Sequence, residues 1–117
     1  MADASGAGDA DDAEPLVSCD LQGGTVSVYE EYVDIDRSSA SMFSGKTIRM
    51  ADVRGVEYTP GILTGHIQIL EDGVEADEAG RLSHPVDENT LYFPRTGRSC
   101  PERLRDAILE RAPQASR

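Results

Sequence analysis

The alternation of apolar and polar residues predicts a chain built mainly of short β-strands. The pattern is clearest from Lys46 to Leu70, which reads KTIRMADVRGVEYTPGILTGHIQIL. There Ile48 precedes Arg49 and Val53 precedes Arg54, so that the aliphatic side chains can be buried while the arginines face water. Gly and Asp residues separate the short runs of β-branched residues. This stretch therefore predicts strand, short turn, strand, corner and strand.

The corner in this stretch has the residues of a type II turn. Pro60 fixes its own φ, and Gly61 is free to take a positive φ. The run that starts at Gly65 then alternates strictly, and period-two alternation assigns its residues to two faces. The inward face is expected to carry Ile67 and Ile69, and the outward face His66 and Gln68.

Four more strands are expected outside the central stretch. A Ser-rich connection at 37–45 is expected to fold Met42 and Phe43 back over the core as a lid. The hairpin signal is the pair of runs that flank Glu30-Glu31. The predicted strands are 16–21, 25–29, 32–36 and 90–94. Their inward residues are predicted to be Val17, Cys19, Leu21, Val26, Val28, Val33, Ile35, Leu91 and Phe93.

One helix is predicted, at Ser99–Arg111. Ser99 followed by Glu102 has the spacing of a capping box, and Pro101 is tolerated in a first turn. Leu104, Ala107, Ile108 and Arg111 fall on one face, and Pro113 ends the pattern. Six or seven strands followed by one amphipathic helix indicate a mainly β fold with a C-terminal helix.

The length of 117 residues predicts one domain. Residues 1–14 hold no large apolar residue after Met1, and we expect a disordered acidic tail there. The domain is predicted to span 15–113, followed by a C-terminal tail at 114–117. The connection at 71–89 is long, and connections of that length are either functional or poorly ordered.

The charge balance excludes one class of partner. The chain has 22 acidic and 11 basic residues, for a net charge of -11. Nucleic-acid backbones attract the opposite sign, so no nucleic-acid partner is expected. Only Lys46 is Lys, and the acid-rich, lysine-poor composition resembles that of proteins from salt-in halophiles such as haloarchaea. In concentrated salt such a charge indicates habitat rather than partner.

The sequence has no apolar run of about 18 residues and no secretory signal pattern. A cytoplasmic location is therefore expected, and the alternative is a membrane-peripheral location. Cys19 and Cys100 lie far apart without a C-x-x-C spacing. In a reducing compartment this favours ordinary small side chains over a disulfide or a metal site. A zinc site with His66 and His84 has irregular spacing, and both histidines are expected at the surface.

One possible function is that of a cation-binding protein that uses the acidic 71–89 loop, although the loop lacks the spacing of a calcium site. The residues that could gather around a cation are Asp72, Glu75, Asp77, Glu78, Asp87 and Glu88. No G-x-S-x-G, H-E-x-x-H or phosphate-binding glycine loop is present in the sequence. The sequence therefore predicts a non-enzymatic protein without a cofactor.

The order of these patterns resembles the bacterial and archaeal pleckstrin-homology-like (PH-like) domains. The resemblance rests on GTVSVYEEYVDID at 24–36, KTIRMADVRGVE at 46–57, GHIQI at 65–69, TLYF at 90–93 and the closing helix. It implies a bent, seven-stranded antiparallel sheet or barrel capped by the helix, in a binding or assembly module that often self-associates. The turn that binds phosphoinositides in the eukaryotic branch here contains Glu30 and Glu31, which would repel phosphate, so that activity is not expected.

The expected function is an interaction module that works by self-association or by binding a protein, through a sheet edge and outward tyrosines. The candidate residues are Tyr29, Tyr32 and Tyr58. The alternative is a peripheral membrane-associated scaffold in cell-envelope or cell-shape organisation, in which Arg49, Arg54 and the loop tip meet lipid.

Overall fold

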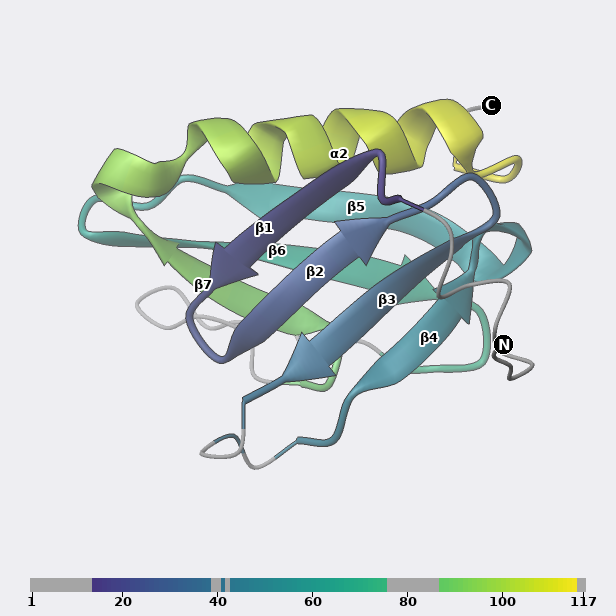
Figure 1. Ribbon diagram of the computed structural model, residues 1–117, viewed down its shortest axis with the longest axis horizontal. Helices are drawn as coiled ribbons and strands as arrows, with labels where there is room; N and C mark the ends of the chain where they lie inside the picture. Colours follow the sequence, from purple (N-terminus) through teal and green to yellow (C-terminus); the bar gives the residue numbers. More distant parts are fainter. Residues whose placement is uncertain (1–13, 39–40, 42, 76–86, 116–117) are drawn as a thin grey trace.

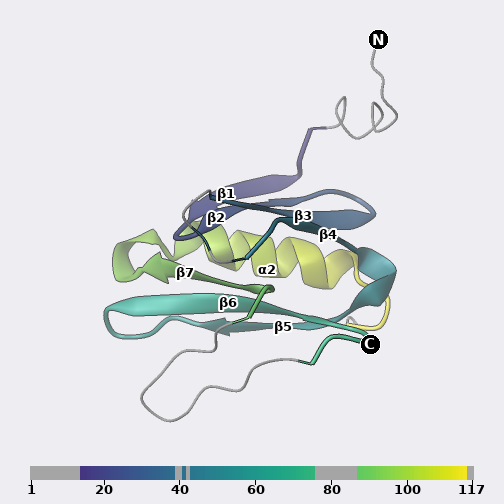
Figure 2. The same ribbon diagram turned by 90° about the horizontal axis from the view of Figure 1, so that it is seen from below.

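The chain folds into two antiparallel sheets and a C-terminal helix (Figure 1). This is seen in a computed structural model that describes residues 14–38, 41, 43–75 and 87–115. The two sheets lie one above the other, and the helix runs along one side of the pair (Figure 2). The prediction of a mainly β chain with one C-terminal helix is therefore confirmed.

The first sheet has four strands in the order β1-β2-β3-β4. They are β1 (Val17–Leu21), β2 (Gly24–Val28), β3 (Tyr32–Arg37) and β4 (Lys46–Arg49), each antiparallel to the next. Cross-strand pairs such as Val26 with Ile35 and Val33 with Ile48 place buried aliphatic side chains opposite one another. This inner face is the one that the alternation predicts.

The second sheet has three strands in the order β5-β6-β7, namely β5 (Val53–Thr59), β6 (Thr64–Glu71) and β7 (Thr90–Pro94). A short 3-10 turn, η1 (Met50–Asp52), leads from the first sheet into the second. The register of β5 shifts between Val53 and Gly55. This bulge lets Val53 and Val56 both pack on the core, although they are three positions apart.

Helix α2 (Ser99–Arg111) follows a second 3-10 turn, η2 (Arg95–Gly97), and has the predicted bounds. Its buried side chains are Pro101, Leu104, Ala107 and Ile108. The predicted capping box is absent, because Arg98 occupies the N-cap position and no side chain caps the helix. In the part of the chain that the structure describes, no helix has the length and apolar character needed to cross a membrane.

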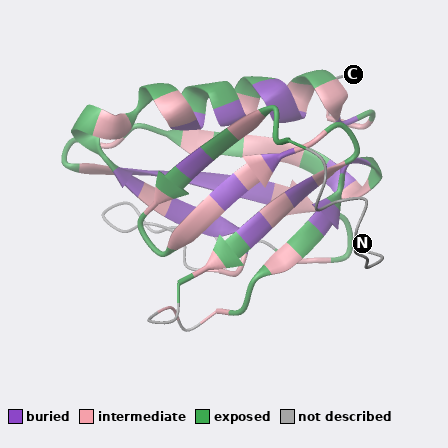
Figure 3. Cartoon of the chain, in the orientation of Figure 1, coloured by how far each residue is buried: buried purple, intermediate pink, exposed green. Residues whose placement is uncertain are grey.

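The core lies between the two sheets and is completed by α2 (Figure 3). Its largest side chain is that of Phe93 in β7, which has no solvent exposure. Gly65 in β6 makes room for this ring, because a Cβ at that position would lie 2.6 Å from a Phe93 ring carbon. Within the described residues one isolated bridge, Gln22 with Tyr92, pairs the two sheets, so they do not close into a barrel.

The outward residues of β6 are buried, contrary to the prediction for His66 and Gln68. Only 7% of His66 and 5% of Gln68 is exposed. Gln68 donates from Nε2 to Asp87 Oδ2 at 2.9 Å, and His66 pairs in register with Tyr92 of β7. Alternation assigns a side chain to a face but does not tell whether other parts of the chain cover that face. His84 lies outside the described residues.

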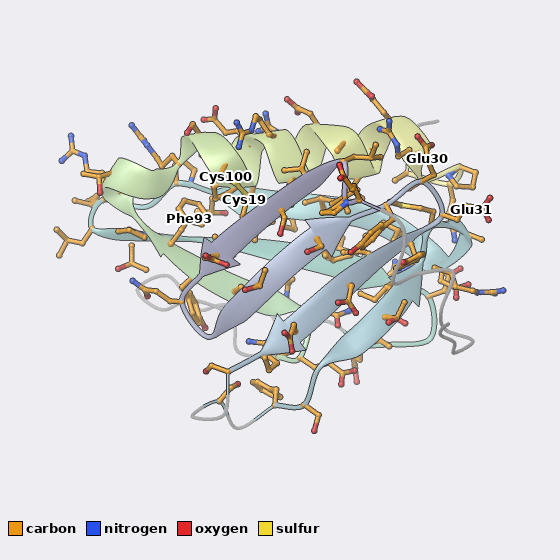
Figure 4. The ribbon with its side chains drawn as sticks, viewed as in Figure 1. Cys19, Glu30, Glu31, Phe93 and Cys100 are labelled. Carbon is orange, nitrogen blue, oxygen red and sulfur yellow. A yellow bond between two sulfur atoms is a disulfide. The ribbon has the colours of Figure 1, made fainter. Side chains whose placement is uncertain are left out.

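Cys19 and Cys100 form a disulfide, so the prediction of two ordinary small side chains is wrong (Figure 4). Cys19 is in the middle of β1, and Cys100 is in the first turn of α2. Their Cα atoms are 6.0 Å apart because α2 packs directly on β1. The bond links positions separated by 81 residues, a pairing that no local pattern indicates.

Polar contacts join the sheets at the β4 side. Lys46 Nζ lies 2.6 Å from Glu71 Oε1 and 2.9 Å from Glu88 Oε2. Arg37 Nη2 donates to the carbonyl oxygens of Glu88 at 2.8 Å and of Thr90 at 3.0 Å. Burial lowers the pKa of Lys46, but its hydrogen bonds to the two glutamates outweigh that effect, and the pKa is raised above 10.5. The lone lysine therefore holds β4 against the second sheet.

Replacing Lys46 with Met is expected to lower the free energy of unfolding by about 1 to 2 kcal/mol at pH 7, because Glu71 and Glu88 lose a charged donor. The folded-state pKa of Lys46 is raised, so its contribution is complete below pH 10.5 and is lost as the pH rises through the raised pKa. Urea denaturation of the wild type and Lys46→Met at pH 7, 9 and 11 measures this difference.

The control is Arg54→Met, which removes an exposed ion pair with Asp72. That variant is expected to change the free energy of unfolding by less than about 0.5 kcal/mol at all three pH values. A difference between the wild type and Lys46→Met that stays constant up to pH 11 would contradict the role given to the lysine.

The structure describes only parts of the two predicted tails, of the predicted Met42-Phe43 lid and of the acidic 71–89 loop. Of the predicted N-terminal tail only Glu14 is described, and Met42 and residues 76–86, which include Asp77 and Glu78, lie outside the description. Phe43 is half-buried beneath the Arg37 guanidinium, 5.2 Å from the ring centroid. Gln114 packs back on the domain, with Nε2 donating to the Ala51 carbonyl at 2.8 Å.

Candidate interaction surface

Among the described residues, nothing covers the outer face of the first sheet, since the core lies on its other side and α2 runs along its β1 edge (Figure 1). Buried residues alternate along each of its strands with intermediate and exposed ones (Figure 3). The less buried positions face outward and form rows across the four strands. Each row can therefore be read from the register of the sheet.

One row brings together an aliphatic, two aromatic and one basic side chain. The Leu16 amide donates to the Val28 carbonyl at 2.7 Å, and the Tyr29 amide donates to the Tyr32 carbonyl at 2.9 Å. Tyr32 is in turn the cross-strand partner of Arg49. We call this set, Leu16, Tyr29, Tyr32 and Arg49, the tyrosine row.

The two tyrosines of the row stack on each other. Their ring centroids are 4.6 Å apart and their planes are inclined by 18°. The cause is the tight β2–β3 turn, in which Glu30 and Glu31 occupy the corner and the residues on either side become cross-strand neighbours. The stacked pair presents a rigid aromatic surface that loses little conformational entropy when it is covered.

The ends of the row are accessible. Leu16 is 43% exposed. The Arg49 side chain is 74% exposed, although Nε lies 3.2 Å from Asp52 Oδ2. Leu16 is not among the interaction residues predicted from the sequence, because a single aliphatic residue at the start of a predicted strand is ordinary. Its alternation with Val17 and Ser18 would have placed it on the outward face.

The other rows of this face are polar. Ser18 and Ser27 share a hydrogen bond of 2.9 Å, Thr25 donates to Asp20 at 2.9 Å, and Thr47 donates to Asp34 at 3.2 Å. The face is therefore divided into an aromatic and aliphatic strip near the β2–β3 turn and a hydroxyl and carboxylate area beyond it. A division of this kind, with an apolar strip and a polar rim, is typical of binding surfaces.

Two of the predicted interaction residues lie elsewhere. The ring of Tyr58 packs on Phe93, with centroids 5.5 Å apart, and its hydroxyl donates to Glu102 Oε2 at 3.1 Å. Burial and then this hydrogen bond raise the pKa of Tyr58. Arg54 is on β5, in the second sheet, and its Nε lies 3.5 Å from Asp72 Oδ1. Neither side chain reaches the tyrosine row.

The residues of the zinc and cation alternatives have other partners. Cys19 and Cys100 are joined to each other. Glu88 pairs with Lys46, and Asp72 accepts a hydrogen bond from Gln114 at 2.6 Å. Among residues 14–38, 41, 43–75 and 87–115, no group of three or more His, Cys, Asp or Glu side chains is arranged to hold a metal ion.

Comparison with protein-family models, with characterised proteins and with solved structures finds no match to this chain.

Proposed function

We propose that this chain is a non-enzymatic interaction module of PH-like architecture that acts by binding a second copy of itself through the tyrosine row. The proposal of PH-like architecture is supported by the order of elements: four strands, then three, then a helix packed on β1 and β5. The proposal of self-association is carried by one observation, the alignment of an exposed aliphatic, a stacked tyrosine pair and an exposed arginine on an open sheet face.

The chemistry of the row suits a protein partner. Tyrosine and arginine are among the residues enriched at positions that dominate binding energy, and neighbouring contacts exclude water around them. The row crosses the whole sheet from β1 to β4, so a two-fold axis through it would bring the same strip of both copies together. The alternative of lipid contact through Arg49 and Arg54 is less well supported, because each guanidinium already lies beside an aspartate.

Replacing Tyr29 and Tyr32 together with Ser is expected to weaken self-association at least tenfold. Each aromatic anchor in an interface contributes about 1 kcal/mol or more, and 1.4 kcal/mol corresponds to a tenfold change in the dissociation constant. The measurement is light scattering over a range of protein concentrations, in both dilute and molar salt, with the wild type and the variant side by side.

The control variant is Ser27→Ala, which changes the polar part of the same face and is expected to associate like the wild type. Circular dichroism confirms that each variant is folded. If the wild type is a monomer at every concentration and salt level, or if the double variant associates as tightly as the wild type, the proposed function is wrong.

A further inference from the structure

The turn between β5 and β6 presents two large aliphatic side chains to solvent. Ile62 is 81% exposed and Leu63 is 80% exposed, the highest values among the exposed large hydrophobic residues of the described chain. They are adjacent, occupy the tip of the hairpin and are not part of the core. This tip lies at the end of the molecule opposite Glu30, Glu31 and the tyrosine row (Figure 4).

The backbone of this tip is fixed. Pro60 restricts one φ, and Gly61 has a φ of +25°, where a Cβ would overlap the carbonyl oxygen of Thr64. The carbonyl oxygen of Leu63 accepts a hydrogen bond from the Arg95 amide at 3.0 Å, which ties the tip to η2. The two aliphatic side chains are therefore held in an exposed position on an anchored turn.

The charge around the tip differs from that of the rest of the chain. Residues 58–70, which contain the tip and most of β6, and residues 89–101, which contain β7 and η2, include no Asp or Glu, whereas the whole chain has 22. Arg95 and Arg98 are exposed beside the tip, and within the described residues neither guanidinium forms an ion pair. Glu102, in the first turn of α2, accepts a hydrogen bond from Tyr58. This corner is therefore basic in an acidic protein.

We propose that the Ile62-Leu63 tip, with Arg95 and Arg98, is a docking site for the surface of a lipid bilayer that carries anionic headgroups. A projecting aliphatic pair fits the boundary between headgroups and acyl chains, and flanking arginines fit phosphate oxygens. The other sides of this protein, with their excess of carboxylates, are repelled by an anionic surface. Charge alone thus selects this corner as the one that approaches the bilayer.

The site is independent of the proposed self-association, because the two surfaces share no residue. Self-association would nevertheless place two tips on one assembly, and two linked tips bind a surface more tightly than one. The inference does not depend on that gain.

The experiment is flotation of the purified chain with phosphatidylcholine vesicles that contain either no phosphatidylglycerol or an equal share of it, at 0.15 M and at 2 M NaCl. The wild type is expected to float with the anionic vesicles at 0.15 M. Ile62→Ser with Leu63→Ser is expected to reduce the bound fraction at least tenfold, because two aliphatic side chains no longer leave water. Arg95→Gln with Arg98→Gln is expected to remove the preference for anionic vesicles.

The matched control is an exposed arginine that lies outside both surfaces, Arg54 in β5. Arg54→Gln is expected to float like the wild type, while the tip variants are expected to keep wild-type light scattering. Failure of the wild type to float at 0.15 M, or flotation of the double tip variant at the wild-type level, would overturn the proposal. Binding of the tip to a protein instead of vesicles would overturn it too. None of these three results would bear on self-association.

Discussion

Reduction of the Cys19–Cys100 disulfide is expected to lower the free energy of unfolding by about 4 kcal/mol. The bond joins residues 81 positions apart, and a cross-link over that length removes much of the conformational freedom of the unfolded chain. Domains of this size are stable by only about 5 to 15 kcal/mol, so the loss is a large part of the total. Guanidinium denaturation with and without a reducing agent measures it as a shift in the midpoint.

The double variant Cys19→Ala with Cys100→Ala separates the bond from the reducing agent. Its stability is expected to match that of the reduced wild type and to be unaffected by reductant. Two free thiols in the unreduced wild type, or identical midpoints with and without reductant, would show that the bond is not formed or does not stabilise the fold.

Replacing Phe93 with Ala is expected to lower the free energy of unfolding by about 3 to 5 kcal/mol. The ring is completely buried between the sheets, packs on Tyr58, and fills the space left by Gly65. Its removal leaves a cavity that the surrounding strands can fill only in part. Urea denaturation at pH 7 measures the effect.

Phe43→Ala is the matched control, because Phe43 is half-buried outside the core and contacts the Arg37 guanidinium. Its loss is expected to cost about 1 kcal/mol. A Phe93→Ala variant that is no less stable than Phe43→Ala would mean that the Phe93 ring does not support the packing of the two sheets.

Local pattern was enough to predict most of the fold. Helix α2 begins at Ser99 and ends at Arg111 as expected, since the apolar spacing, Pro101 in the first turn and Pro113 after the last turn mark both ends. The strands agree within one or two residues, because alternation and Gly-rich turns act over short distances. The bulge in β5 explains why Val53 and Val56 both face inward despite an odd spacing.

The features that the sequence did not reveal depend on contacts between distant segments. The disulfide requires α2 to lie on β1, which no spacing between the two cysteines indicates. His66 and Gln68 are buried because their strand is the middle one of its sheet and its outward side is covered, and alternation is the same whether that side is covered or open. The helix lacks the predicted cap because the preceding 3-10 turn brings the chain into α2 with Arg98 already in helical conformation.

The candidate surface could be predicted in part. The hairpin signal alone makes Tyr29 and Tyr32 neighbours, while the place of Arg49 beside them depends on the register between β3 and β4. The strand pattern predicts an outward, interface position for Tyr58, yet its ring packs on Phe93. The exposure of Ile62 and Leu63 follows from the length of the β5–β6 turn, which the Pro60-Gly61 pair indicates but does not fix.

The link between β1 and α2 also makes most of the polypeptide a covalent ring. A protease that cuts one peptide bond anywhere between Cys19 and Cys100 leaves two fragments that stay joined through sulfur. The fragments remain at a high effective concentration, so the nicked molecule can keep its two sheets together. Damage in the long connection between β6 and β7 is therefore tolerated without separation of the parts.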